Sequence, residues 1–267
     1  MRFVKSVSEV ADITPHKFDD VRRHIDVDWI IRALEATGTA STRTRRLPAI
    51  QVIWIVIAMA LFRNRPIAEI VAKLDLALPG EAPDVANSAV PQARARLGPE
   101  PLEWLFNHTA EKWAHASAAA HQWRGLSVYG VDGSTLWVAD SPANRAHFGG
   151  TSGKRGPSGY PLVRIVTLMA LRSHLVASAE FGPYGTGEHT YALNLWSLVP
   201  DNSLTIVDKG FFAAYVLMPL ARDGKNRHWL TRAKKGLRWR VTKRLGYPFT
   251  RSCDVGPCTL CEINRRA

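Results

Sequence analysis

The sequence predicts an α+β or α/β protein in which an all-helical N-terminal region precedes a domain of mixed strands and helices. Over residues 1–122, apolar side chains recur at helical spacing and prolines stand where helices would begin. After Gly125, short runs rich in β-branched and aromatic residues alternate with helical segments. Helices first and mixed elements second indicate two domains, and we place the start of the second at residue 123.

Five helices are expected in the N-terminal region. The first carries an apolar stripe and ends at the pair Thr37-Gly38, which is typical of a helix C-terminus. Each of the other four begins at a proline, which is favoured in the first helical turn. The expected segments are 26–36, 48–62, 67–76, a short helix opened by Pro91, and a long helix from 99 to about 116.

The second region begins with a β-rich run over 126–131. We expect this run to turn back at Asp132-Gly133 into a return strand over 135–138, because an aspartate–glycine pair is a common hairpin turn. The sequence contains no internal repeat. The remaining expected elements are strands over 161–171, 175–181, 203–207 and 228–231, and helices over 187–198 and 211–221.

Composition and net charge exclude several classes of protein and indicate the kind of partner. The chain has 267 residues, 46% hydrophobic and 22% charged, which excludes a disordered or collagen-like protein. Its 35 Lys and Arg against 23 Asp and Glu leave a formal net charge of +12, which favours a polyanionic partner, nucleic acid above all. The longest apolar run, 50–62, is shorter than the roughly 20 residues that cross a bilayer. Without a secretory signal, we expect a cytoplasmic protein and no membrane partner.

Two aspartates stand at the ends of expected strands. Asp132 follows the first strand and Asp208 follows the strand over 203–207, each with a glycine close by. Carboxylates at neighbouring strand ends can hold Mg²⁺, which prefers oxygen ligands, and a pair of such ions can activate a water and stabilise a leaving 3′-oxygen. The alternative is that each aspartate is only a turn or helix-cap residue.

A resemblance favours the first interpretation. The sequence Val-Asp-Gly-Ser-Thr at 131–135, with the blocks at 140–144 and 148–149, resembles the first catalytic block of bacterial DDE transposases of the insertion-element-four type. The sequence Ile-Val-Asp-Lys-Gly-Phe-Phe at 206–212 resembles their second block, with lysine in place of the usual arginine. The resemblance implies a ribonuclease H-like catalytic core, Mg²⁺ chemistry (or Mn²⁺) at DNA ends, and Asp132 and Asp208 as the first two catalytic and metal-binding acids.

The third acid of that family has no clear counterpart. After Asp208 the chain offers Asp223, Asp254 and Glu262, and none has the expected helical context. Glu188 is a further candidate, although capping of the helix that begins there explains it about as well. Since the resemblance fades after Gly246, we expect a truncated or frameshifted copy, with a partial catalytic domain over 123–246 and a non-native or out-of-frame tail over 247–267.

That tail contains all three cysteines. Cys253, Cys258 and Cys261 have the spacing of an iron–sulfur loop or the start of a zinc site, but no Cys or His follows to supply a fourth ligand.

The pair Gly153-Lys154 could suggest a phosphate-binding loop. It lacks the first glycine and the hydroxyl residue of that motif, so a basic loop that touches DNA phosphates is the better interpretation. The histidines form no recognisable motif.

Basic residues indicate where DNA would bind. Residues 222–244 carry ten basic residues and one acid, interleaved with Trp229 and Trp239, a pattern that favours a surface following phosphates. A helical DNA-binding domain over 1–122 is implied by the family resemblance. The expected DNA-binding residues are Arg94, Arg96, Lys154, Arg155, Lys234, Lys235, Arg238 and Arg240.

The predicted function is cut-and-paste DNA transposition on double-stranded DNA, both element ends and target, with self-association on the DNA. Because the third acid is missing from the expected position, little or no strand transfer is expected of the chain itself. Two alternatives stay open. One is a DNA-binding remnant that competes for element ends, and the other is a nuclease that cuts without joining.

Overall fold

The computed structural model describes residues 21, 23–40, 47–75, 88–153, 156–157 and 159–232, together with two short strands at 243–244 and 251–252. The chain divides into two compact units, Met1–His108 and Thr109–Ala267. Among the described residues, no helix combines the length and the apolar character that a membrane span requires.

The first unit is helical, as predicted. Its central helix α4 packs against α3, α5 and α6 and buries apolar side chains on several sides, including Trp54 and Ile53. Helix α3 begins where the Asp26 carboxylate accepts the backbone N–H of Asp28 at 3.0 Å, which satisfies an N–H that the helix leaves free. The helices are α3 (Val27–Ala36), α4 (Ala49–Leu61), α5 (Ile67–Asp75), α6 (Ala89–Leu97) and α7 (Glu100–Thr109).

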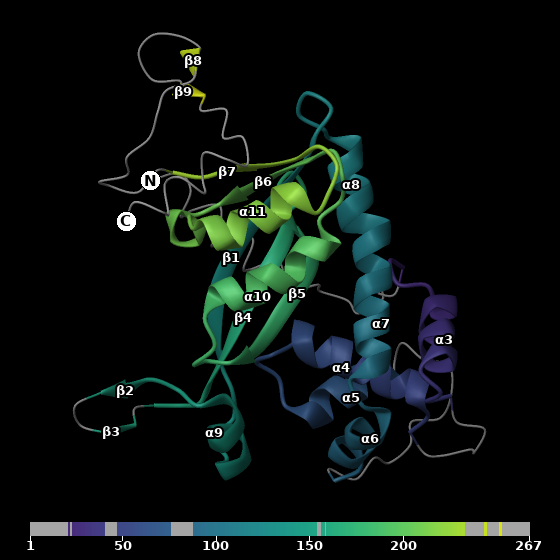
Figure 1. Ribbon diagram of the computed structural model, residues 1–267. Coiled ribbons are helices and arrows are strands. Elements are labelled where there is room, and N and C mark those ends of the chain that lie inside the picture. Colours follow the sequence, from purple (N-terminus) through teal and green to yellow (C-terminus); the bar gives the residue numbers. More distant parts are fainter. Residues whose placement is uncertain are drawn as a thin grey trace. The chain divides into compact units, whose positions relative to one another are not determined.

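The second unit contains a five-stranded mixed sheet in the order β5-β4-β1-β6-β7 (Figure 1). The central strand β1 pairs with β4 antiparallel on one side and with β6 parallel on the other. Outside these, β5 is antiparallel to β4, and β7 is parallel to β6. The strands are β1 (Ser127–Trp137), β4 (Leu162–Ala170), β5 (Leu175–Pro183), β6 (Ser203–Val207) and β7 (Arg227–Leu230).

Helical segments pack against this sheet and connect its strands. The α10 and α11 helices lie across one face of it in Figure 1 and bury apolar residues there with the inward side chains of the strands. The segments are the π-helix η1 (Ala110–His115), α8 (Ala116–Ala120), α9 (Pro142–Phe148), α10 (Glu188–Leu195), the 3₁₀ turns η2 (Trp196–Leu198) and η3 (Lys209–Phe211), and α11 (Ala214–Arg222). Two short hairpins complete the unit: β2 (Ser152–Gly153) with β3 (Gly156–Pro157), and β8 (Lys243–Arg244) with β9 (Arg251–Ser252).

Strand alternation separates the two faces of the sheet. In β1, Tyr129 and Val131 are buried in the core with their partners Ala170 and Leu168 on β4, whereas Asp132 is exposed. Because successive side chains of a strand point to opposite faces, Gly133 shares the covered face with Tyr129 and Val131. The Asp132 side chain therefore points to the other face.

The expected hairpin at Asp132-Gly133 is wrong. Strand β1 runs without interruption from Ser127 to Trp137, and Asp132 and Gly133 pair with Thr167 and Val166 of β4. Gly133 marks a close approach instead of a turn, because a Cβ there would lie 2.5 Å from the carboxyl carbon of Glu188. The other predicted strands and helices of this unit are present, and the α+β class with a helical N-terminal region is confirmed.

The long helix expected from residue 99 is also present, as an uninterrupted helical run over 100–120 that includes η1. The division between the two units falls within this run, at Thr109. Ala114 and Ala118 belong to the core of the sheet, which explains why the second unit begins before the change in composition at Gly125. The functional assignment of the three predicted segments stays a prediction, and the boundary at 246 lies outside the described residues.

Candidate active site

The two predicted acids lie next to each other at one end of the parallel strand pair. Val131 of β1 and Val207 of β6 are register partners, and both are buried in the same core. The residue after each valine is an aspartate. The two backbone positions are neighbours, because the paired strands lie about 4.8 Å apart. Asp132 is still within β1 and points away from the covered face, whereas Asp208 follows the end of β6 as the N-cap residue of η3. Both residues are exposed.

Backbone N–H groups orient the two carboxylates. The Oδ1 atom of Asp132 accepts the N–H of Gly133 at 2.8 Å. The Oδ1 atom of Asp208 accepts the N–H of Gly210 at 2.6 Å and caps η3, and Thr231 donates its hydroxyl to the Asp208 carbonyl at 3.0 Å. Asp208 is therefore a cap residue, as the alternative interpretation proposed, but the cap uses only one carboxylate oxygen.

The donor set suits a hard divalent cation. Within the part of the chain that the structure describes, the second oxygen of each aspartate takes no hydrogen bond, and no group of three or more Asp, Glu, His or Cys gathers. Mg²⁺ is commonly held by one or two carboxylates together with waters and substrate phosphates. Asp132 and Asp208, which are exposed and follow paired backbone positions, fit that pattern.

Glu188, the further candidate for the third acid, lies on the other face of the sheet. It occupies the space beside Gly133 and accepts a hydrogen bond from Arg164 Nη1 at 2.7 Å. The Arg164 side chain is only 18% exposed, also donates to the Tyr184 carbonyl at 3.1 Å, and lies over the Tyr184 ring. Glu188 thus balances a largely buried arginine.

Among the described residues, the acids that follow Asp208 in the sequence supply no further ligand for a cation. Asp223 pairs with its neighbour Arg222, and the hydrogen bonds from that guanidinium lower the pKa of the carboxyl group. Asp254, Glu262 and the three cysteines lie outside the described residues.

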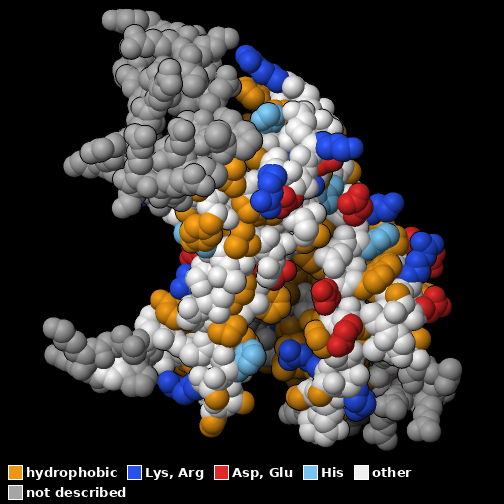
Figure 2. Space-filling model, in the orientation of Figure 1, with side chains coloured by type: hydrophobic (Ala, Val, Ile, Leu, Met, Phe, Trp, Pro, Cys, Tyr) orange, Lys and Arg blue, Asp and Glu red, His pale blue; other side chains and the backbone are white. Residues whose placement is uncertain are grey.

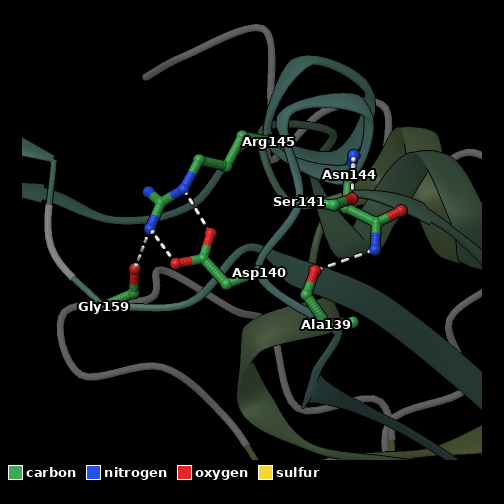
Figure 3. Close-up of polar contacts among 6 residues, drawn as sticks. All are labelled: Ala139, Asp140, Ser141, Asn144, Arg145 and Gly159. Atoms are coloured by element: carbon green, nitrogen blue, oxygen red, sulfur yellow. Dashed lines mark hydrogen bonds and ion pairs between the residues drawn. The ribbon is translucent and has the colours of Figure 1, made fainter.

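A cluster of polar residues after the end of β1 connects helix α9 with the segments before and after it by hydrogen bonds (Figure 3). Arg145 of α9 binds both oxygens of Asp140 and donates to the Gly159 carbonyl at 3.0 Å. Hydrogen bonding by Arg145 lowers the pKa of Asp140. Ser141 caps α9 through the N–H of Asn144, whose side chain donates to the Ala139 carbonyl. Residues 140–144, expected as part of the first catalytic block, here connect β1, α9 and the approach to β4.

His189 was missed by sequence reasoning, which gave the histidines no role. Its Nε2 atom lies 2.9 Å from the carbonyl oxygen of Gly210, in the turn that follows Asp208, and its Nδ1 atom is hydrogen-bonded to the Tyr215 hydroxyl. Residues 189 and 210 belong to α10 and η3. No local sequence pattern connects them, since they meet only because the chain crosses from α10 through β6.

The expected DNA-binding residues are only partly described. Arg94 and Arg96 are exposed in the last turn of α6. Trp229, expected to interleave with the basic run, is half-buried and packs against Phe212 at 6.0 Å between ring centroids. On the face shown in Figure 2, the described Lys and Arg side chains lie among acidic and apolar ones. The others lie outside the described residues: Lys154, Arg155, Lys234, Lys235, Arg238 and Arg240.

Comparison with known proteins identifies the family. The family model for the N-terminal domain of insertion element 4 transposases matches residues 15–107. The chain is 38% identical over 223 residues to the transposase InsG for insertion sequence element IS4 of Escherichia coli K12, a match that covers 84% of this chain and 50% of InsG. It is 38% identical over 218 residues to InsZ of the same strain, which covers 80% of this chain and 71% of InsZ. The chain thus spans about half the length of InsG, and it belongs to the IS4 family of transposases.

Proposed function

We propose that the chain carries the metal-binding aspartate pair of a DNA transposase, in a ribonuclease H-like core. The observation that supports this proposal is the parallel register of Val131 and Val207, since the exposed residues Asp132 and Asp208 directly follow these two partners. Membership of the IS4 family supports DNA as the substrate. The sheet order, with β1 between an antiparallel and a parallel neighbour, supports the core assignment.

The reaction consists of cleavage at the element end and strand transfer. In cleavage, a water oxygen attacks the phosphorus and the 3′-oxygen of the element leaves as a hydroxyl. In strand transfer, that hydroxyl attacks a target phosphodiester and displaces a second 3′-oxygen. Mg²⁺ or Mn²⁺, when bound, lowers the pKa of water and stabilises charge on the leaving oxygen.

The chain's own residues prepare this chemistry. Among the described residues, one carboxylate oxygen of Asp132 and one of Asp208 take no hydrogen bond, and the N–H groups of Gly133 and Gly210 hold the carboxylates in place. This orientation lowers the reorganisation that metal and phosphate binding would otherwise need. We also propose phosphate contacts by Arg94 and Arg96 and by the basic residues outside the described part, and self-association on DNA.

A second candidate is a DNA-binding protein that occupies element ends without cutting them. The observation in its favour is that, among the described residues, the aspartate pair gathers no third carboxylate. A protein of this kind would need the basic residues but neither Asp132 nor Asp208.

A cleavage assay distinguishes the two functions. The substrate is a labelled duplex that carries the DNA flanking the coding gene, with Mg²⁺ or Mn²⁺ present. A 3′-hydroxyl product that disappears in Asp132→Asn and Asp208→Asn supports the transposase. Binding that both variants retain, without cleavage by any, supports the second candidate. Cleaved products that never join to target DNA support a nuclease, and absence of DNA binding contradicts both proposals.

A further inference from the structure

His189 takes part in a chain of hydrogen bonds that ends at the carboxylate of Asp208. The Gly210 residue lies between them: its N–H donates to Asp208 Oδ1 at 2.6 Å, and its carbonyl oxygen lies 2.9 Å from His189 Nε2. The Tyr215 hydroxyl meets His189 Nδ1 on the far side of the ring. Residues from α10 and α11 therefore reach the turn that carries the second acid.

The partners determine the tautomer of His189. A carbonyl oxygen can only accept, so Nε2 must carry the hydrogen that binds Gly210. In a neutral imidazole, Nδ1 is then an acceptor, and the Tyr215 hydroxyl donates to it. All three hydrogen bonds therefore run in the same donor-to-acceptor direction. The Tyr215 hydroxyl donates to Nδ1, Nε2–H donates to the Gly210 carbonyl, and the Gly210 N–H donates to Asp208 Oδ1.

The Asp208 carboxylate and the Gly210 backbone have little freedom to move relative to each other. A Cβ at position 210 would lie 2.7 Å from Asp208 Oδ1, so the carboxylate lies directly against the glycine backbone. Any rotation of the 210 backbone would therefore move the N–H that holds the carboxylate. The bond from His189 restrains that rotation from the carbonyl side.

We propose that His189 is a positioning residue for Asp208, acting through Gly210, with Tyr215 fixing the imidazole tautomer. This inference rests on the proposed function, since it assigns to His189 the orientation of a metal-binding carboxylate. Groups that orient metal ligands in this way typically change metal affinity by about 10–100-fold when they are removed. His189 is half-buried and Tyr215 is 59% exposed, so substitutions here remove little of the core.

Two amide substitutions separate positioning from packing. In His189→Gln the side-chain amide reaches the place of Nε2 and can still donate to the Gly210 carbonyl. In His189→Asn the amide reaches only the place of Nδ1, and the bond to Gly210 is lost. His228→Asn is the matched control, because His228 is exposed on β7 and its Nε2 bonds to Asn226.

The full chain is titrated with Mn²⁺ alone, and binding is followed by water proton relaxation. We expect His189→Asn to weaken Mn²⁺ binding by about tenfold or more, and His189→Gln and His228→Asn to stay within about twofold of the unmodified chain. Equal weakening in the Gln and Asn variants, or no change in either, would overturn the positioning role.

A second measurement keeps this inference separate from the proposed function. Solvent exchange of the Gly210 amide, measured by NMR without metal, should be severalfold faster in His189→Asn and unchanged in His189→Gln. If Asp208→Asn leaves Mn²⁺ binding intact, the proposed metal site fails while the exchange data still test the restraint on Gly210. Exchange that is equal in both His189 variants contradicts the restraint itself.

Discussion

Val131 on β1 and Val207 on β6 are register partners in the parallel part of the sheet, and an aspartate follows each of them. Both valines are buried, and Asp132, the next residue of β1, faces the opposite side of the sheet. Asp208 follows the end of β6 and caps η3. The pairing of the two valines therefore makes the two acids neighbours in the candidate site, and both acids are exposed.

Replacing Gly133 should destabilise the second unit. In Gly133→Ala the new methyl group would meet the Glu188 side chain, whose carboxylate is held by Arg164. Overpacking of this kind costs about 1–3 kcal/mol in the free energy of unfolding, which urea denaturation measures. Gly185→Ala is the control, because a Cβ at 185 has nothing within 4 Å. Equal stability of the two variants would show that Glu188 moves aside freely.

Glu188 should matter for stability and not for metal binding. Glu188→Gln removes the charge that balances Arg164, whose side chain is 18% exposed, and should cost about 1–2 kcal/mol in the free energy of unfolding. Its Mn²⁺ affinity should match that of the unmodified chain, since Glu188 lies on the face opposite Asp132. A marked loss of Mn²⁺ affinity with unchanged stability would instead make Glu188 the third acid.

Asp208 should combine two separable roles. Asp208→Asn keeps an oxygen that can accept the Gly210 N–H, whereas Asp208→Ala removes the cap of η3. The alanine variant should therefore be less stable than the asparagine variant by about 1 kcal/mol, measured by thermal or urea unfolding. Both variants should lose Mn²⁺ binding. Retention of Mn²⁺ binding by the asparagine variant would reduce Asp208 to a cap residue.

The second unit should lose stability in mild acid through His115. Its Nδ1 lies 2.8 Å from the Tyr129 hydroxyl, and burial lowers the pKa of His115 below the ordinary value of 6.5. The unfolded chain therefore takes up a proton as the pH falls through 6.5 while the folded chain does not, so the contribution of His115 is present above 6.5 and declines below it. Urea unfolding from pH 8 to pH 5 should show this decline, and His115→Gln should flatten it.

The contact between His115 and Tyr129 should also make the stability of the second unit depend on pH in the alkaline range. Burial raises the pKa of Tyr129 to about 12, whereas an exposed tyrosine titrates near 10.0. The unfolded chain ionises first as the pH rises, so stability should fall between about pH 10 and pH 12. Tyr129→Phe should remove this part of the pH dependence. An unchanged alkaline profile in that variant would contradict the burial argument.

Elements with strong periodicity could be predicted from the sequence. The apolar helix α4, the strands β4 and β5 and the helix α10 lie close to their expected bounds. The two candidate acids could be named from the sequence, because each directly follows a β-rich run, and their metal-binding role stays a prediction. Local pattern was sufficient in these cases because burial of one face or one stripe produces the periodicity.

Other features depend on contacts between distant segments. Gly133 has the local pattern of a turn residue, and only the position of Glu188, 55 residues later, shows why glycine is needed inside a continuous strand. Helix α9 is seven residues long and buries no side chain, so it leaves no apolar stripe to detect. The bond from His189 to Gly210 depends on the crossover between α10 and η3, which a single sequence does not reveal.

Asp132 and Asp208 are expected to hold one divalent cation together. The most direct test is a Mn²⁺ titration followed by water proton relaxation, on the unmodified chain, Asp132→Asn, Asp208→Asn and the double variant. We expect each single variant to abolish measurable binding, and the double variant to lose no more, because residues that share one site act non-additively. Glu180→Gln, on β5 of the same unit, should bind like the unmodified chain. Mn²⁺ binding of unchanged affinity in either aspartate variant, or no binding by the unmodified chain, would show that the two aspartates form no shared cation site.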